Sequence, residues 1–111
     1  MFTCVLWQVF GGLGDGTRLN DVHLLDLRTL MWRTPPTHGA KPPPRSHHAC
    51  CVFGDQLLVL GGLAQAEGAR RLLPSADLYV LDLNTWSWSC AMTQGTRPSA
   101  RLDLGMAVVR T

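Results

Sequence analysis

The sequence has little net charge and few aromatic residues. Ten Lys and Arg against eight Asp and Glu give a formal net charge of +2, and only one of the 111 residues is tyrosine. So small a positive charge does not by itself indicate nucleic acid or an anionic membrane as a partner. A chain of this length forms one domain at most and buries roughly two thirds of its unfolded surface. We therefore expect one small globular unit that binds neither nucleic acid nor membrane.

The sequence also lacks a zinc motif and a secretion signal. Its four cysteines show neither CxxC spacing nor the pattern of a disulfide-rich secreted domain. We expect free, buried thiols in a reducing compartment. The apolar segment Met1 to Phe10 has no basic flank or cleavage site, and it is too short to span a bilayer. These absences favour the cytosol or the nucleus.

A metal or cofactor site is not expected either. On a strand, His47 and Cys51 would share one face while His48 and Cys50 would share the other. Each face then offers two ligands, fewer than the four of a structural zinc site. No nucleophile with a base and an orienting acid stands out, so we expect no cofactor and no enzymatic activity.

Glycine and proline are plentiful, and they shape the central stretch from Pro44 to Gly62. The chain has 11 Gly and 7 Pro, so no window of helical length is free of a helix breaker or of strand-like alternation. Residues 46–53 read as an extended run, Gly54-Asp55 as a turn, and 56–60 as an apolar strand that ends at a double glycine. The stretch predicts a β-hairpin.

This unit occurs twice. Val9-Phe10-Gly11-Gly12 matches Val59-Leu60-Gly61-Gly62 at an offset of 50, and residues 21–32 match residues 77–88 at an offset of 56. In each copy a polar loop (13–20 or 63–76) follows the glycines, then a strand, an Asp-initiated turn, and a last strand that contains Trp. Four strands in about 50 residues is the period of a propeller blade. The apolar runs 57–60 and 78–81 are continuous, which indicates sheets that stack face to face.

These motifs resemble the kelch-repeat family over about Val5 to Val109. The resemblance rests on Arg45 and His48 before a strand, on the two glycine doublets, on Tyr79, and on the spacing of Trp32 and Trp88. It implies an all-β fold, a partial kelch-type β-propeller with two four-stranded antiparallel blades plus the first strand of a third. It also implies that both tryptophans pack between neighbouring blades, near the glycine doublets. The chain departs from the family pattern at His23, in place of the usual Tyr, and at 102–104, where Leu-Asp-Leu replaces a Ser-His-His sequence.

The expected organisation follows from this alignment. Residues 4–34 form a first repeat that lacks its innermost strand, 35–44 a Pro-rich inter-blade linker, 45–92 a second repeat, and 93–111 a linker with the first strand of a third repeat. The resemblance implies that a complete propeller of this kind is a closed ring of five to seven blades. Two blades leave two apolar faces open, so we expect either part of a longer propeller or self-association that completes the ring.

The resemblance places partner binding on the inter-strand and inter-blade loops, which lie on one face. Seven of the ten basic residues fall there: Arg18, Lys41, Arg45, Arg70, Arg71, Arg97 and Arg101. Such an asymmetry favours a protein partner that is acidic. The expected partner-binding residues are Arg18, Lys41, Arg70, Arg71 and Arg97. The expected structural residues are Gly11, Gly12, Trp32, Arg45, Gly61, Gly62, Tyr79, Trp88 and Arg101.

Alternatives stay open for several of these features. Arg45 and Arg101 recur at equivalent positions and either contact a partner or brace the start of a blade by bonding backbone. The loop 64–76 is either a contact surface or a plain solvated loop, and the Pro-rich linker is either a connector or a PxxP-type ligand.

The function that the sequence favours is a protein-protein interaction module, acting as a scaffold or as the substrate-recognition part of an assembly such as a ubiquitin ligase adaptor. One alternative is a truncated propeller product without function. The other is an enzyme similar to the copper radical oxidases with kelch repeats, whose site needs two tyrosines. The single tyrosine, Tyr79, disfavours that enzyme.

Overall fold

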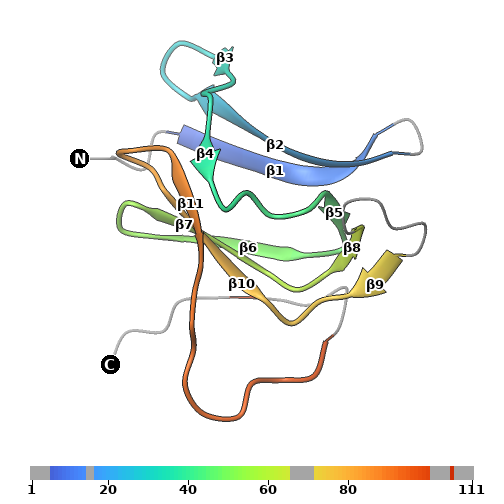
Figure 1. Cartoon of the computed structure of the whole chain (residues 1–111). Helices are drawn as coiled ribbons and strands as arrows, with labels where there is room; N and C mark the ends of the chain where they lie inside the picture. The colour runs from blue at the N-terminus through green and yellow to red at the C-terminus, as the bar shows by residue number, and fades with distance from the viewer. Residues whose placement is uncertain (1–5, 15–16, 66–71, 101–105, 107–111) are drawn as a thin grey trace.

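The computed structural model describes residues 6–14, 17–65, 72–100 and 106, and the fold of this part of the chain is all-β (Figure 1). No helix in the described ranges is long and apolar enough to cross a membrane. In chain order the strands are β1 (Leu6–Gly14), β2 (Thr17–Asp26), β3 (Met31–Arg33), β4 (His38–Gly39), β5 (Arg45–Ser46), β6 (Ala49–Phe53), β7 (Gln56–Leu60), β8 (Leu63–Gln65), β9 (Leu72–Pro74), β10 (Leu78–Asp82) and β11 (Ser87–Cys90).

The second repeat forms the predicted blade. Strands β6, β7, β10 and β11 are neighbours and pair antiparallel. The turn between β6 and β7 holds Gly54 at φ +59°, a left-handed conformation that favours glycine. A fifth strand, β4, comes from the Pro-rich linker and pairs parallel with the outer strand β11. The linker therefore extends the blade besides connecting the two repeats.

The first sheet differs from the expected one. Its main part is the long β1–β2 hairpin. Strand β3 pairs with β2 and is the last strand of the predicted blade. The strand was expected to end at Gly11-Gly12, with a polar loop over 13–20, but β1 continues to Gly14 and β2 begins at Thr17. Pairing resumes after the glycines because a β-bulge there absorbs the register shift between Phe10 and Gly12.

In the second repeat the equivalent glycines, Gly61-Gly62, do end the strand, since β7 stops at Leu60. The loop that follows is more ordered than predicted, because β8 and β9 pair antiparallel within it. Through β5, this small hairpin joins the end of the first sheet. The extended run expected over 46–53 is also broken, at His47, where φ is +61°. The chain therefore passes from the first sheet (β5) to the second (β6) at this residue.

Both predicted Asp turns are confirmed. The Oδ1 atom of Asp26 accepts hydrogen bonds from the amides of Arg28 and Thr29, at 2.8 and 3.4 Å. Asp82 does the same for the amides of Asn84 and Thr85, at 2.8 and 3.1 Å. The repeat is thus preserved down to the hydrogen bonds of its turns.

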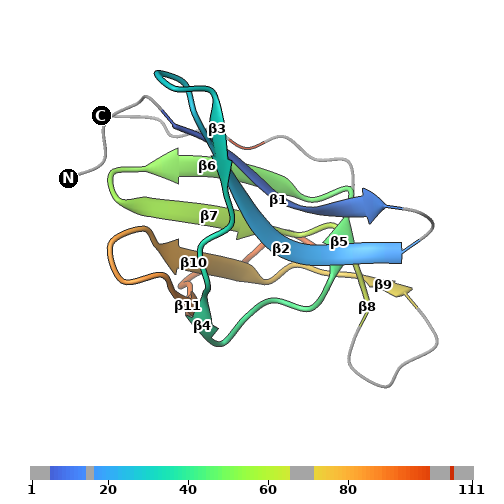
Figure 2. The same cartoon turned by 90° about the horizontal axis from the view of Figure 1, so that it is seen from above.

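The two sheets pack face to face, with the β1–β2 hairpin crossing over the second sheet (Figures 1 and 2). The first sheet contributes Phe10, Val22 and Leu24 to the core, and the second contributes Leu57, Val59, Leu81, Leu83 and Trp88. These side chains are at most 6% exposed. Residues two apart on one strand share a face, so the opposite faces of both sheets point away from this core.

The three cysteines that the structure describes have free thiols, and these are less buried than expected. Among the described cysteines, Cys50 and Cys90 are exposed and Cys51 is half-buried. Cys50 and Cys51 lie on β6, the edge strand of the second sheet. The expected first strand of a third repeat lies outside the described residues, apart from Met106.

Candidate functional site

The joint between the sheets is formed by the start of the second blade and the glycine doublet of the first. His48 Nε2 donates a hydrogen bond to the carbonyl oxygen of Phe10, 2.9 Å away. The Phe10 ring lies edge-on to His48, at 5.4 Å between centroids, and tilted against Trp88, at 5.1 Å. At Gly11, where φ is +64°, a Cβ atom would lie 3.0 Å from the carbonyl oxygen of Leu19. Glycine is required there because the β2 backbone at Leu19, the β5 backbone at Arg45 and the His48 ring all approach it closely.

The environment of the His48 imidazole favours its neutral form. Burial lowers its pKa, the charges of Arg45 and His47 lower it further, and the Phe10 carbonyl partly opposes both effects. The Nε2 atom carries the proton, since it donates to a carbonyl. Nδ1 of His48 and Nε1 of Trp88 are buried without a hydrogen-bond partner within the described part of the chain. A second proton on His48 would therefore be buried without an acceptor.

Arg45 lies beneath the loop end of the second blade and is 1% exposed. Its guanidinium donates to the carbonyl oxygens of Pro43, through Nε at 3.1 Å, and Gly61, through Nη1 at 3.0 Å. Its Cζ atom lies 5.1 Å from the centroid of the Tyr79 ring, a cation-π arrangement. Burial lowers the pKa of Arg45, and the nearby Tyr79 and Asp77 oppose that change. The arginine ties the linker to the glycine doublet by hydrogen bonds to backbone and packs on Tyr79 of β10. This geometry favours the bracing alternative.

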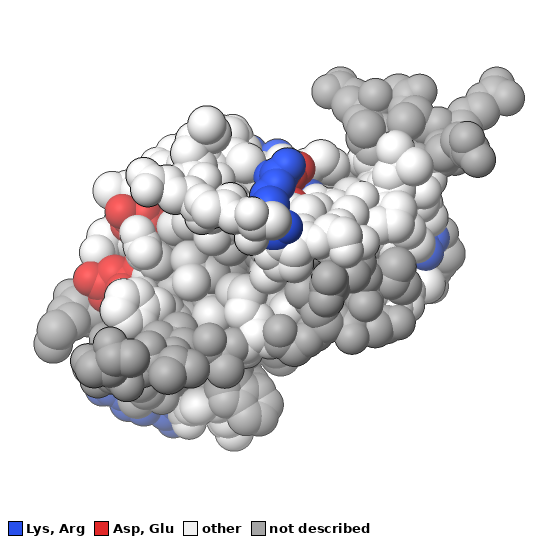
Figure 3. Space-filling model, turned by 90° about the horizontal axis from the view of Figure 1, so that it is seen from below, with Lys and Arg blue, Asp and Glu red and all other residues white. Residues whose placement is uncertain are grey.

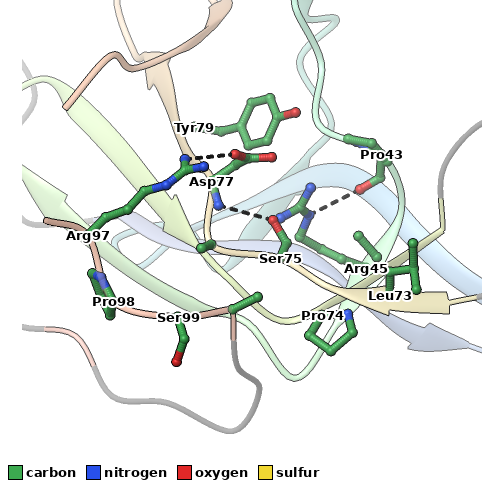
Figure 4. A pocket seen from close by; sticks show the side chains of 13 residues that line it. Pro43, Arg45, Leu73, Pro74, Ser75, Asp77, Tyr79, Arg97, Pro98 and Ser99 are labelled. Carbon is green, nitrogen blue, oxygen red and sulfur yellow. Dashed lines mark hydrogen bonds and ion pairs between the residues drawn. The ribbon is translucent and has the colours of Figure 1, made fainter.

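A cavity of about 610 Å³ opens beside this arginine, where the β8–β9 hairpin, the start of β10 and the segment after β11 meet (Figure 4). The side chains that line it are Pro43, Arg45, Ala64, Leu73, Pro74, Ser75, Ala76, Asp77, Tyr79, Arg97, Pro98, Ser99 and Ala100. Arg45 and Tyr79 form one wall, and Arg97 comes from the opposite side. The cavity combines apolar proline and leucine surface with two cations and one carboxylate.

The polar groups at the cavity differ in how firmly they are held. Arg97 Nη1 lies 3.3 Å from Asp77 Oδ1, and the two side chains are 60% and 48% exposed. Exposed ion pairs of this kind contribute little to stability. The amide of Asp77 donates to the Ser75 hydroxyl at 3.1 Å, which orders the chain beneath the carboxylate. Arg97 can therefore exchange partners at small cost, whereas Arg45 cannot.

The basic residues that the sequence predicted on one face lie in different surroundings in the structure. Arg97 lines the cavity, and Arg18 is close to the start of the second blade, where its Nε donates to the Ser46 hydroxyl at 3.1 Å. Lys41 is exposed on the crossover between β4 and β5 and does not line the cavity. Figure 3 shows one face of the molecule, on which the basic atoms of the described residues lie in several separate groups, one of them beside acidic atoms, and form no continuous patch. Arg70, Arg71 and Arg101 lie outside the described residues.

The two tryptophans are not equivalent in the structure. Trp88 is 3% exposed and packs on Phe10, whereas Trp32 is 57% exposed. Trp88 pairs with Leu81, which faces the first sheet, but Trp32 pairs with Leu25, on the side of the first sheet opposite the core. The expectation that Trp32 packs between blades is wrong for the described residues, because no second sheet covers that side.

The glycines of the two doublets also have different structural roles. At Gly62, where φ is +90°, a Cβ would lie 2.7 Å from the carbonyl oxygen of Ser46. Gly61 is buried, and its carbonyl accepts the Arg45 hydrogen bond. Gly12 has φ +100° but open space around it. The doublets therefore serve close backbone approach at Gly11 and Gly62, and the β-bulge of β1 at Gly12.

Sequence reasoning missed Phe10 and Asp77. Phe10 occupies the position of Leu60 in the repeat, so its aromatic ring was a signal of a contact particular to the first sheet. Asp77 was recognised only as a repeat position equivalent to Asp21. In the described residues no group of three or more His, Cys, Asp or Glu side chains is placed to hold a metal ion.

Comparisons with known proteins match the same features. Residues 5–111 match the family model described as the KLHDC2/KLHL20/DRC7 Kelch-repeats domain. Dynein regulatory complex subunit 7 of Chlamydomonas reinhardtii is 37% identical over 97 residues, which are 84% of this chain and 8% of that protein. Kelch domain-containing protein 2 of Bos taurus is 40% identical over 80 residues, 72% of this chain and 18% of that protein.

A third relative is the Rab9 effector protein with kelch motifs of Bos taurus, 39% identical over 97 residues, 86% of this chain and 25% of that protein. The chain thus spans a quarter or less of the length of these three relatives. The family match covers both sheets, the glycine doublets and the buried Arg45 and Trp88, and it agrees with the face-to-face packing of two small antiparallel sheets. The chain belongs to the kelch-repeat family.

Proposed function

We propose that this chain is a protein-interaction segment of a kelch propeller and that it binds an acidic segment of a partner protein at the cavity beside Arg45. The observation that carries the proposal is the position of Arg97 at this cavity. It holds Asp77 through an exposed ion pair that a partner's carboxylate can replace.

The size and the lining of the cavity suit one or two side chains of an extended protein segment. Its volume of about 610 Å³ is of the size that ligand pockets in proteins have. Leu73 and Pro74 offer apolar contact, and Leu73 is 60% exposed. Arg45 is occupied by two carbonyls and the Tyr79 ring, so it supports the cavity wall while Arg97 recognises the charge.

Further basic residues would steer the same partner. Arg18 lies near the start of β2 and Lys41 on the crossover between β4 and β5, and Arg70 and Arg71 belong by sequence to the loop after β8. Exposed charges outside a contact mainly raise the rate of association. We therefore assign these four residues to steering and Arg97 to contact.

The names of the relatives fit an interaction role. One is called an effector of Rab9 and another a subunit of the dynein regulatory complex. For this chain we propose a place in a larger assembly in the cytosol or nucleus, as a scaffold or as the part that recognises substrates of a ubiquitin ligase.

The proposal is tested with fluorescent peptides rather than with an unknown partner. The full chain is titrated with extended decapeptides rich in Asp and Glu, and with matched peptides in which Asn and Gln replace the acids. We expect binding of the acidic set only, and a loss of tenfold or more for Arg97→Glu, about 1.4 kcal/mol or more. Arg28→Glu, in the exposed turn after β2, is the matched control, because it changes the net charge equally at a distance from the cavity. Equal losses for both variants would contradict a specific site, and no difference between the peptide sets would contradict acid recognition.

A further inference from the structure

Thr34 begins the linker between the two repeats, directly after strand β3. The residue is exposed, and residues 34–37 form no regular secondary structure. Because Pro35 follows, the backbone of Thr34 is biased toward an extended conformation. Within the 111 residues, Thr34-Pro35 is the only Ser-Pro or Thr-Pro pair. The protein thus presents one hydroxyl on an exposed, extended stretch that a proline defines, which is the form in which a modifying enzyme can bind it.

The hydroxyl of Thr34 contacts a histidine that is itself held by a carboxylate. Leu24 pairs with Arg33 in the register of β2 and β3, so the next residue, Thr34, lies opposite His23. Thr34 Oγ1 lies 3.1 Å from His23 Nδ1, and His23 Nε2 lies 2.7 Å from Asp21 Oδ2. A carboxylate only accepts, so Nε2 carries the ring proton and Nδ1 accepts from the hydroxyl. The hydroxyl therefore has a base beside its proton, while the lone pairs of its oxygen take no part in this bond.

Position 34 stays accessible when another sheet packs on its side of the blade. At the offset of 56, Cys90 and Asp77 of the second blade correspond to Thr34 and Asp21. Cys90 pairs with Tyr79, which packs against the core that the first sheet covers. Even so, Cys90 is exposed, and the Asp77 side chain is 48% exposed. Accessibility thus belongs to the position in the blade and does not require an uncovered face.

We propose that Thr34 is a phosphorylation site for a proline-directed kinase and that His23 holds the phosphate. Oγ1 of Thr34 bonds to the γ-phosphorus of ATP, the bond from that phosphorus to the bridging oxygen breaks, and ADP leaves. The hydroxyl proton moves to Nδ1 of His23. The imidazolium then donates to the phosphate through Nδ1 and to Asp21 through Nε2, and both hydrogen bonds are charge-assisted. The phosphate therefore fastens the start of the linker to the first sheet.

The site is tested by treating the full chain with magnesium ATP and a proline-directed kinase. Mass spectrometry of the intact chain and of its fragments should show one phosphoryl group, on Thr34. Thr34→Ala and Pro35→Ala should each lose it. Thr37→Ala is the matched control, because Thr37 lies in the same linker without a following proline, and it should be modified like the original chain.

A synthetic peptide of residues 29–40 reports on the kinase itself. Modification of the peptide but not of the folded chain would show that the fold shields Thr34, and this overturns the proposal. Failure of both substrates overturns it as well, since the sequence is then not recognised. A phosphoryl group that persists in Thr34→Ala would place the modification elsewhere, with the same consequence.

The role of His23 is tested by melting curves of the phosphorylated and unphosphorylated chain. We expect phosphorylation to raise the melting temperature by about 4 °C or more, and His23→Ala to abolish that rise. Each protein is compared with its own unmodified form, so stability lost through the substitution itself cancels. His38→Ala, at a histidine of β4 that contacts the Thr85 carbonyl oxygen instead, is the control and should keep the rise. No rise in the original chain, or a rise that survives His23→Ala, overturns the assignment of the phosphate to His23.

Discussion

The His48 imidazole and the Phe10 carbonyl join the two sheets through a hydrogen bond of 2.9 Å. The donor belongs to the start of the second blade and the acceptor to the residue before the first glycine doublet, 38 positions earlier. Gly11 next to that acceptor leaves room for the His48 ring, whose Cε1 atom would lie 3.1 Å from a Cβ placed there. One histidine and one glycine thus fix how the repeats sit on each other.

This relationship predicts a pH-dependent stability. The pKa of His48 is lowered in the folded protein, and an unfolded histidine titrates near pH 6.5. The unfolded state therefore binds more protons just below that pH. The His48 contribution is fully present above about pH 6.5 and is lost as the pH falls from there toward the lowered folded pKa.

Melting temperatures of the chain at pH 7.5 and pH 5.5 check this, with His48→Gln as the comparison. Glutamine can donate to the Phe10 carbonyl but does not titrate. We expect the original chain to lose more stability than the variant on acidification, and the difference isolates His48 from the other histidines. Parallel pH profiles for the two proteins would contradict the assignment.

The two tryptophans should differ in their effect on stability. Trp88→Ala removes a buried side chain that contacts Phe10, and we expect a cost of about 3 to 5 kcal/mol in the free energy of unfolding. Trp32→Ala removes a side chain that is 57% exposed, so the cost should be less than about 1 kcal/mol. Urea denaturation at a protein concentration low enough to avoid self-association measures both values. Similar losses would show that Trp32 is covered within the monomer.

Arg45 should be intolerant even of lysine. Its planar guanidinium reaches two carbonyls and lies over the Tyr79 ring at the same time, which an ammonium cannot do. We expect Arg45→Ala to cost about 2 to 4 kcal/mol through unsatisfied carbonyls and lost packing, and Arg45→Lys to cost roughly half of that. Arg33→Ala, an exposed arginine on β3, serves as the control and should be close to neutral. A tolerated Arg45→Lys in urea denaturation would argue against the importance of the paired bonds.

The sequence predicted the local structure of the second repeat well because its signals are local. Gly54 supplies the turn conformation, Asp82 bonds the amides of its own turn, and Gly61-Gly62 follow the end of β7. The first repeat carries equivalent glycines, but after a β-bulge the pairing of β1 with β2 continues beyond them. Whether a strand ends at glycine or continues depends on its partner strand, and an apolar pattern does not report that.

The candidate site was harder to predict, for a related reason. The basic residues were grouped by the loops that carry them, but Arg45 turned out to be enclosed by backbone, and Lys41 does not line the cavity. The cavity itself depends on Asp77 and on the path of the segment around Arg97, which folds back toward β10. A contact between residues 20 positions apart, with no regular structure between β11 and Arg97, leaves no periodic signal.

The glycine doublets offer a test that separates backbone strain from steric contact. Gly12 and Gly62 both adopt positive φ, +100° and +90°, so alanine is strained at either position. A Cβ at Gly12 meets open space, whereas at Gly62 it would lie 2.7 Å from the Ser46 carbonyl oxygen and 2.8 Å from His48 Cα, both backbone atoms that cannot move aside cheaply. We therefore expect Gly12→Ala to cost about 1 to 2 kcal/mol, the strain alone, and Gly62→Ala clearly more. Urea denaturation of the two variants gives the difference, which reports the close approach at the start of the second blade. Equal costs would mean that β7 and the chain around Ser46 can separate without loss, and the joint between the repeats would then depend on His48 and Phe10 alone.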